Sequence, residues 1–345
     1  MTRRTNRRRF LCMTLGTVPW WLPRGRSALG EEHAVKSTRL QTATEKGWAL
    51  GSAVSMTALH ADRATAQRAV ARAMDELRLV ERLMSLYRPQ SQLARLNRDG
   101  VLSDPHPYLV EVLHAAQNMS GRTGGAFDIT VQPLWKCYET AAKADGMPKP
   151  DDLAGALQKV DWRQVEISTR RVRLRGKGTA VTLNGIAQGF AADRAVAVLT
   201  RHGIEHALVD TGEIGTLGTK EQDGSHEERA WTVGIQHPRR DDAYLGLAKL
   251  EGRCLATSGD YATTFSPDCR DNHLFDPRTG RSPVAFSSVS VAAATAMQAD
   301  ALSTALFVLG PERGLKLVQS TPKADALFVL KDGRTRATEG FPQDA

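Results

Sequence analysis

The stretch Asn184-Gly185-Ile186-Ala187-Gln188-Gly189 is the starting point for predicting the fold. It follows a short apolar run, Ala180–Leu183, which we predict to be a strand, and it leads into a helix predicted over Ala187–His202. Glycine lets backbone approach a ligand closely, and the start of a helix favours an anion. A strand, a glycine-rich turn and a helix in this order therefore indicate a site for a phosphate-bearing ligand.

Three other glycine-rich or polar stretches interrupt the predicted elements, at Gly124–Thr130, Asp210–Gly215 and Thr257–Tyr261. A turn glycine explains each of them taken alone, but four such stretches in one chain favour a phosphate ligand. No stretch matches GxxxxGK[ST], and no GxGxxG lies between a strand and a helix. These absences exclude a P-loop and leave a dinucleotide-binding Rossmann site unsupported.

Outward from these stretches, apolar spacing predicts an amphipathic helix over Asp62–Met84 and another around Leu109–Met119. Residues 139–155 mix Ala, Lys, Asp, Gly and Pro and are predicted to form an exposed loop. Further helices are predicted over Ala299–Leu309 and Glu312–Ser320. Predicted strands follow one another in runs, which favours an α+β fold over a doubly wound sheet. These strands are Trp48–His60, Val165–Ile167, Val172–Leu174, Ala207–Val209, Trp231–Gln236, Tyr244–Leu250, Ser288–Ala294 and Ala326–Leu330.

The formal charge of +8 is concentrated at the N-terminus, because residues 1–30 contain seven arginines and no acid. The rest of the 345-residue chain is left with about +1, which argues against nucleic acid as a partner. No apolar run is long enough to span a bilayer. Three widely spaced cysteines follow the leader, without a CxxC pair, and indicate buried thiols rather than a zinc site.

The leader itself is similar to a twin-arginine export signal, since Arg7-Arg8-Arg9-Phe10-Leu11 precedes an apolar stretch. A disordered basic tail is the alternative. We therefore expect a signal peptide over 1–30, a linker over 31–47, one domain over 48–335 and a tail over 336–345, with the mature protein in the periplasm.

Two clusters contain the residue types that phosphate chemistry needs. Residues 272–280 combine His273, a possible proton carrier, with Asp276 and Arg278 in an Asp-Pro sequence that also fits a simple turn. Asp300 and Thr304 lie four residues apart on a predicted helix and so share a face. A carboxylate and a hydroxyl suit Mg²⁺ better than zinc, although Asp300 could instead cap the helix.

Read in order, these stretches resemble the ApbE family of FAD:protein FMN transferases. The resemblance extends from Trp48 to Leu330 and implies an α+β fold with mixed, mainly antiparallel sheets and flanking helices. Its motifs are Ser85–Ser91 with Leu93 and Asn97, Ala126–Asp128, Asn184–Ala191, Ala256–Tyr261, His273–Gly280 and Ala299–Ala305.

The resemblance implies a role for each matching residue. Gly185, through its backbone carbonyl, and the side chains of Asp300 and Thr304 match the ligands of Mg²⁺. His273 matches the histidine near the reacting phosphates, and either His273 or Asp276 is the expected general base. The matching FAD contacts are Leu50, Tyr87, Ala126, Phe127, Asp128, Thr182, Gln188 and Phe275.

Several positions depart from the usual family pattern. Leu50-Gly51-Ser52 stands for Met-Gly-Thr, Thr182 for Asp, Gln188 for Lys or Glu, and Thr211-Gly212-Glu213 for Gly-Gly-Asp. These variants resemble the NosX-type branch, which accompanies nitrous-oxide reductase maturation.

The activity implied is Mg²⁺-dependent transfer of FMN from FAD to a Ser or Thr hydroxyl of an acceptor flavoprotein, expected to be a membrane-associated respiratory protein, with release of AMP. Two alternatives stay open at this stage. One is an FAD pyrophosphatase that yields FMN and AMP, and the other is a periplasmic flavin-binding assembly factor without turnover.

Overall fold

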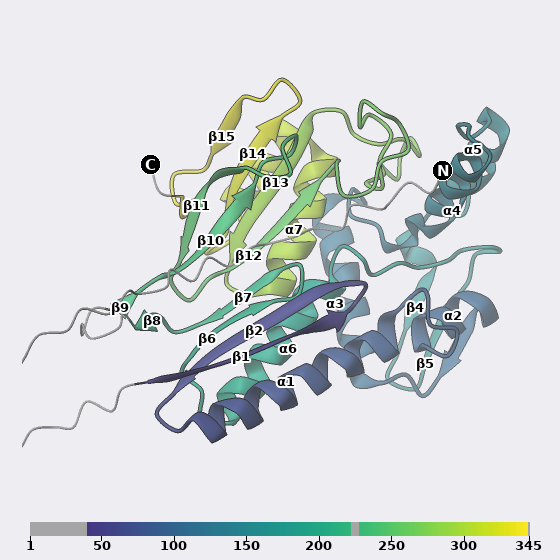
Figure 1. Cartoon of the computed structure of the whole chain (residues 1–345). Helices are drawn as coiled ribbons and strands as arrows, with labels where there is room; N and C mark the ends of the chain where they lie inside the picture. The colour runs from purple at the N-terminus through teal and green to yellow at the C-terminus, as the bar shows by residue number, and fades with distance from the viewer. Residues whose placement is uncertain (1–39, 222–227, 344–345) are drawn as a thin grey trace, which may run out of the picture.

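A computed structural model describes residues 40–221 and 228–343, so the predicted signal peptide lies outside the described residues. Its centre is an eight-stranded sheet in which every neighbouring pair is antiparallel, in the order β1-β2-β6-β7-β12-β13-β14-β15 (Figure 1). The predicted α+β fold with mainly antiparallel sheets is confirmed. The strands are β1 (Gln41–Ala49), β2 (Ser52–His60), β6 (His206–Asp210), β7 (Ile214–Leu217), β12 (Cys254–Gly259), β13 (Phe286–Ala293), β14 (Asp325–Leu330) and β15 (Thr335–Ala337).

The first two strands correct the sequence prediction at the start of the domain. Residues 41–47, expected in a linker, form most of β1, and the single strand expected over Trp48–His60 is interrupted by a turn. Leu50 and Gly51 make this turn with φ values of 53° and 77°. Positive φ at both central residues matches the twist of a two-residue hairpin. The linker prediction was wrong here because β1 is a largely exposed edge strand without a continuous apolar pattern.

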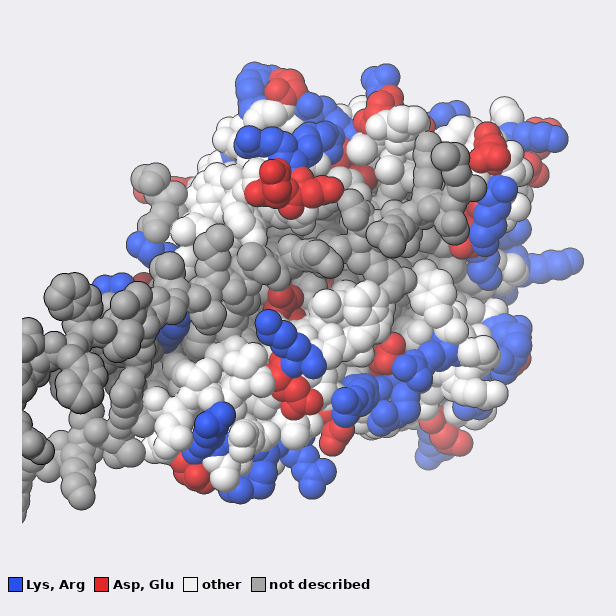
Figure 2. All heavy atoms as spheres, viewed as in Figure 1, with Lys and Arg blue, Asp and Glu red and all other residues white. Residues whose placement is uncertain are grey.

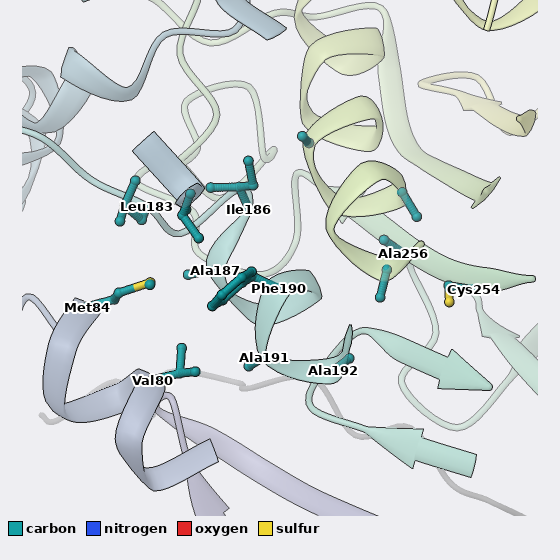
Figure 3. Packing of buried hydrophobic residues seen from close by; sticks show 14 of the residues in the cluster. Val80, Met84, Leu183, Ile186, Ala187, Phe190, Ala191, Ala192, Cys254 and Ala256 are labelled. Atoms are coloured by element: carbon teal, nitrogen blue, oxygen red, sulfur yellow. The ribbon is translucent and has the colours of Figure 1, made fainter. Parts of the chain in front are cut away.

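Helices cover one face of the sheet: α1 (Arg63–Met84), α6 (Ala187–Arg201) and α7 (Ala296–Leu309) pack against it, as Figure 1 shows. The predicted helices agree with α1, α3 (Pro107–Thr123), α6, α7 and α8 (Pro311–Gln319) to within a few residues. Their apolar stripes meet the sheet in one large buried cluster. Figure 3 shows part of it, where Val80 and Met84 of α1 lie near Phe190 of α6.

The opposite face carries the hairpin of β10 (Trp231–Gln236) and β11 (Tyr244–Leu250), which encloses a second apolar cluster with the sheet (Figure 1). The C-terminal segment completes this layer. Phe341 is buried in the cluster, and the backbone N–H of Lys249 donates to the carbonyl of Pro342 at 2.8 Å. Residues 336–343, predicted to be a tail, are thus packed structure. Strands β8 (Lys220–Glu221) and β9 (Glu228–Arg229) form a short separate pair.

A smaller unit stands beside the helices. Its three-stranded sheet, in the order β3-β5-β4, includes the predicted hairpin. The exposed loop predicted over 139–155 was wrong, because helices occupy most of it and leave only residues 144–149 between them. The elements are α2 (Gln92–Asp99), β3 (Val101–Ser103), η1 (Ile129–Val131), α4 (Gln132–Lys143), α5 (Pro150–Leu157), η2 (Trp162–Gln164), β4 (Val165–Ile167) and β5 (Arg171–Leu174).

Residues 180–183, predicted to be a strand, are irregular backbone. The side chain of Asn97 takes the place of a neighbouring strand, because its amide donates to the Val181 carbonyl and accepts from the Val181 N–H, both at 2.7 Å. The N–H of Thr182 donates to the Ile129 carbonyl at 2.8 Å. Backbone polar groups in this buried stretch are therefore satisfied without a sheet.

Two further predictions from the sequence concern membrane spans and the state of the cysteines. None of the helices in residues 40–221 and 228–343 is long and apolar enough to cross a membrane. Cys137, Cys254 and Cys269 are free thiols. Only Cys254 is fully buried, and this burial raises its pKa to about 12.

Candidate active site

A pocket opens between α7, the start of α6, the end of β12 and the loop 260–285 that follows β12. Nine of the thirteen predicted site residues line it: Ala126, Phe127, Asp128, Thr182, Gly185, His273, Phe275, Asp300 and Thr304. They come from four separate parts of the chain, which the fold brings to one place. Leu50, Tyr87, Gln188 and Asp276 do not line it.

Gly185 reaches the pocket wall because its neighbours are anchored in the core. Leu183 and Ile186 are both about 1% exposed and belong to the large cluster, as Figure 3 shows for their side chains. A Cβ atom on Gly185 would lie 2.9 Å from the hydroxyl oxygen of Thr304. A side chain at this position would thus press on Thr304, so glycine keeps the backbone next to that hydroxyl.

Asp300 and Thr304 stand one turn apart on α7 and both face the pocket. Helix α7 begins at Ala296, and its N-cap is Thr295, whose side chain accepts from the N–H of Gln298 at 3.1 Å. The capping alternative for Asp300 is therefore excluded. Instead, a carboxylate oxygen of Asp300, which is 3% exposed, accepts from the Gly189 N–H of α6 at 3.0 Å.

Helices α6 and α7 are in direct backbone contact at this point. A Cβ atom on Gly189 would lie only 2.2 Å from the Ala296 carbonyl oxygen, so the two backbones touch. The carboxylate of Asp193 accepts from the N–H groups of Ala296 and Met297 at 2.7 and 2.9 Å and so caps α7 from α6. Burial raises the pKa of Asp193, while these hydrogen bonds oppose the shift. This contact therefore sets the distance between Gly185, two residues before α6, and Asp300, in the second turn of α7.

The loop between β12 and β13 supplies the other wall. His273 is held by its backbone N–H, which donates to the Thr263 carbonyl at 3.1 Å, and its ring Nδ1 lies 3.3 Å from the same oxygen. Phe275 is 4% exposed and packs against Tyr138, with ring centroids 5.0 Å apart. An imidazole thus faces the pocket from a loop that is fixed by an aromatic cluster.

Ala126, Phe127 and Asp128 form the third side. Both carboxylate oxygens of Asp128 are occupied: one accepts from the N–H and hydroxyl of Thr130 at 2.7 and 2.6 Å, and the other from the Trp162 N–H at 3.0 Å. Burial raises the pKa of Asp128, and the hydrogen bonds from Thr130 and Trp162 oppose that shift. Asp128 therefore shapes this turn as well as lining the pocket.

Asp276 makes the Asp-Pro turn that was the alternative to a catalytic role. Its carboxylate accepts from the guanidinium of Arg278 at 2.7 and 2.8 Å, and its carbonyl accepts from the N–H of Gly280 at 2.8 Å. Because Asp276 is engaged in this turn away from the pocket lining, the geometry favours His273 as the base.

The other three residues outside the pocket are Tyr87, Leu50 and Gln188. Tyr87 lies on the surface, and Leu50 and Gln188 contact other segments of the chain. Tyr87 is 73% exposed, and Leu50 packs partly buried against the core at the β1–β2 turn. The Gln188 amide donates to the Thr211 carbonyl at 2.9 Å and to the Ser52 hydroxyl at 3.3 Å. In this structure Gln188 thus joins the start of α6 to the β1–β2 and β6–β7 turns.

Residues outside the predicted set also line the pocket, including Gln132, Trp135, Asn184 and Ser258. Asn184 and Ser258 stand inside quoted motifs, and their polar side chains were a usable signal. Gln132 and Trp135 lie on α4, in a region with no motif, and only the fold reveals them.

The charge of the pocket limits what can bind there. Among the described residues that line it, none is Lys or Arg, and two are acids, Asp128 and Asp300. In residues 40–221 and 228–343 no three His, Cys, Asp or Glu side chains gather in a way that could hold a metal. Asp300, Thr304 and the backbone carbonyl expected of Gly185 offer only oxygen atoms, a set that fits Mg²⁺ completed by water and phosphate oxygens.

Sheet topology and pocket together define an antiparallel α+β protein with a largely apolar pocket between two helices and a histidine loop, in which Asp300 and Thr304 present oxygen atoms. The profile of the ApbE family matches residues 50–328, and the chain belongs to the ApbE family.

Several proteins similar to this chain are FAD:protein FMN transferases. The chain is 35% identical over 279 residues to the FAD:protein FMN transferase of Treponema pallidum (strain Nichols), which covers 76% of each sequence. It is 30% identical over 312 residues to the enzyme of the same description from Klebsiella pneumoniae (strain 342), covering 86% of this chain and 87% of the relative. The crystal structure of the ApbE protein of Thermotoga maritima superimposes with a TM-score of 0.77 at 27% identity, over 88% of this chain and all of that one.

Proposed function

We propose that this chain is an FAD:protein FMN transferase, which moves FMN from FAD to a Ser or Thr hydroxyl of an acceptor protein. Its family membership supports this activity. The observation that carries the proposal is the juxtaposition of Gly185, Asp300 and Thr304 with His273 around one pocket.

The reaction has a simple balance. The acceptor oxygen forms a bond to the FMN phosphorus, the bond from that phosphorus to the oxygen bridging to AMP breaks, and AMP leaves. The hydroxyl proton passes to a base. Such a transfer depends on positioning and on neutralising charge more than on covalent catalysis.

Different residues of the pocket are suited to charge neutralisation, to proton transfer and to the exclusion of water. Mg²⁺ held by the Gly185 carbonyl, Asp300 and Thr304 would neutralise charge on the phosphate oxygens. A metal is needed for this because none of the described residues that line the pocket is Lys or Arg. His273, with its backbone fixed at the Thr263 carbonyl, accepts the proton of the incoming hydroxyl. Phe127 and Phe275 offer apolar walls that exclude water.

The assay follows AMP release from FAD by purified protein with Mg²⁺, with and without a candidate acceptor domain expressed in cells lacking this enzyme. A transferase releases AMP in proportion to acceptor, and the same domain with its acceptor Ser or Thr changed to Ala gives none. AMP release at the same rate without acceptor identifies a pyrophosphatase, and FAD binding without AMP in either arm identifies a binding protein. Both results would contradict the proposal.

We further propose that the enzyme works in the periplasm after twin-arginine export, on a membrane-associated respiratory flavoprotein. The support is the leader, with its seven arginines, no acid and the sequence Arg7-Arg8-Arg9-Phe10-Leu11. The variants at Leu50, Thr182 and Gln188 favour the NosX-type branch, whose acceptor serves nitrous-oxide reductase. Changing Arg7 and Arg8 to Lys is expected to retain the precursor inside the cell and leave the acceptor without covalent FMN. Labelled acceptor in the double variant would rule out this route.

A further inference from the structure

We propose that Ser258 is a positioning residue that fixes the direction of the Thr304 hydroxyl, so that its oxygen presents lone pairs to a cation in the pocket. This inference rests on the proposed function, because it concerns the same metal ligand. Neither the family resemblance nor the sequence motifs assigned a role to Ser258.

Ser258 takes part in a chain of three hydroxyls between the sheet and α7. It lies on β12, is 4% exposed, and its Oγ stands 2.8 Å from the Ser303 Oγ and 3.0 Å from the Thr304 Oγ1. Ser303, which is 1% exposed, donates its own proton to the backbone carbonyl of Asp300 at 2.9 Å. The strand therefore contacts two consecutive residues of α7 at the pocket wall.

Counting protons gives these contacts a direction. A hydroxyl has one proton to donate and two lone pairs to accept with. Because a carbonyl can only accept, the proton of Ser303 is committed to Asp300, and Ser303 must accept from Ser258. The proton of Ser258 is then used, so Ser258 must accept from Thr304. The chain runs from Thr304 to Ser258 to Ser303 to the Asp300 carbonyl.

The consequence lies at the start of the chain. With its proton directed to Ser258, the Thr304 oxygen has only lone pairs left for its other neighbours. One of these neighbours is Gly185, since a Cβ atom added there would stand 2.9 Å from the Thr304 oxygen. Oxygen lone pairs are what Mg²⁺ and Mn²⁺ require, so the hydroxyl is set as a cation ligand before any metal arrives.

The direction of these hydrogen bonds leads to a prediction that the packing of the three side chains alone would not make. In Ser303→Ala, Ser258 loses its acceptor and its proton can turn to the Thr304 oxygen, where it competes with the cation. Loss of Ser303, which does not line the pocket, is therefore expected to weaken metal binding. Ser258→Ala is expected to weaken it because Thr304 then has no fixed acceptor for its proton.

The test is a titration of the full chain with Mn²⁺ alone, in which free Mn²⁺ is followed by electron paramagnetic resonance and no turnover is involved. We expect Ser258→Ala to bind about 10- to 100-fold more weakly, as is typical when a residue that orients a metal ligand is lost. Ser303→Ala is expected to bind more weakly as well. Ser258→Thr retains a hydroxyl and is expected to restore most of the affinity.

Ser290 provides a matched control, because it is also a buried serine (1% exposed) in a hydroxyl pair, with Thr257 at 2.8 Å. Ser290→Ala is expected to lose similar stability and bind Mn²⁺ like the wild type. If Ser258→Ala and Ser303→Ala both bind like the wild type, Ser258 has no positioning role, while the proposed function stands. If Asp300→Asn binds as tightly as the wild type, the metal assignment itself fails, and this inference fails with it.

Discussion

The close backbone contact between α6 and α7 can be tested by the substitution Gly189→Ala. The new Cβ would lie 2.2 Å from the oxygen and 2.6 Å from the carbon of the Ala296 carbonyl, and 2.8 Å from the Cβ of Asp300. Two of these atoms are backbone, so no side-chain rotation relieves the contact, and the helices must separate by roughly 1 Å to restore ordinary van der Waals distances.

The expected cost has two parts. Overpacking of a buried contact costs about 1–3 kcal/mol of the free energy of unfolding. Weakening the charge-assisted hydrogen bond from the Gly189 N–H to Asp300, now 3.0 Å, adds on the order of 1–2 kcal/mol. This separation would move Asp300 and Thr304, which lie on α7, away from Gly185. The affinity for Mn²⁺ is therefore expected to fall together with stability.

Urea unfolding and Mn²⁺ titration measure the two effects. Gly121→Ala is the matched control, because Gly121 lies within helix α3 and a Cβ there meets nothing within 4 Å. This variant is expected to gain up to about 1 kcal/mol from helix propensity and to bind metal normally. Gly189→Ala with wild-type stability and wild-type metal affinity would refute the idea that close helix contact sets the site.

Two other variants are informative. His273→Ala is expected to lower kcat for AMP release by about a hundredfold or more with little change in FAD affinity, as for loss of a general base, whereas Asp276→Asn, in the neighbouring turn, is expected to retain most of kcat; a collapse of affinity with an unchanged rate would make the role of His273 structural. Burial raises the pKa of Asp210 to about 6, from 3.8, so its ionisation opposes folding and the stability of the wild type is expected to decline as pH rises from about 4 to about 6. Asp210→Asn is expected to be more stable than the wild type at pH 7, by up to about 3 kcal/mol, with the difference disappearing below pH 4 in parallel urea titrations; equal stability at both pH values would show that Asp210 is not a buried charge.

The parts of the fold with a strong apolar period were predictable from sequence. Helix α1 agrees almost residue for residue, since its buried positions repeat every three or four residues and Asp62 caps its start. Strand β1 was not, because an exposed edge strand needs no apolar pattern, and α4 and α5 were hidden by their mixed composition. Strand β12 was missed because Thr257, Ser258 and Gly259 resemble a loop, although all three are buried in the sheet.

The site divides in the same way. Spacing alone placed Asp300 and Thr304 on one helix face, and the structure puts both in the pocket that Gly185 lines, with Thr304 next to Gly185. Spacing could not show that Asp276 is held in a turn by Arg278, since that depends on local backbone geometry. Nor could it reveal the hydroxyl chain from Thr304 through Ser258 to Ser303, which needs two distant segments in contact. On the face shown in Figure 2, acidic and basic side chains are interspersed, as the near-neutral charge of the body implies.

The most direct measurement of the central claim is the intact mass of a flavin-free acceptor domain after incubation with this protein, FAD and Mg²⁺. The account predicts an increase equal to one FMN less one water, an equimolar amount of AMP, and neither product when Asp300 is changed to Asn or Mg²⁺ is chelated. An unchanged acceptor mass while AMP accumulates, or full labelling by Asp300→Asn, would contradict it.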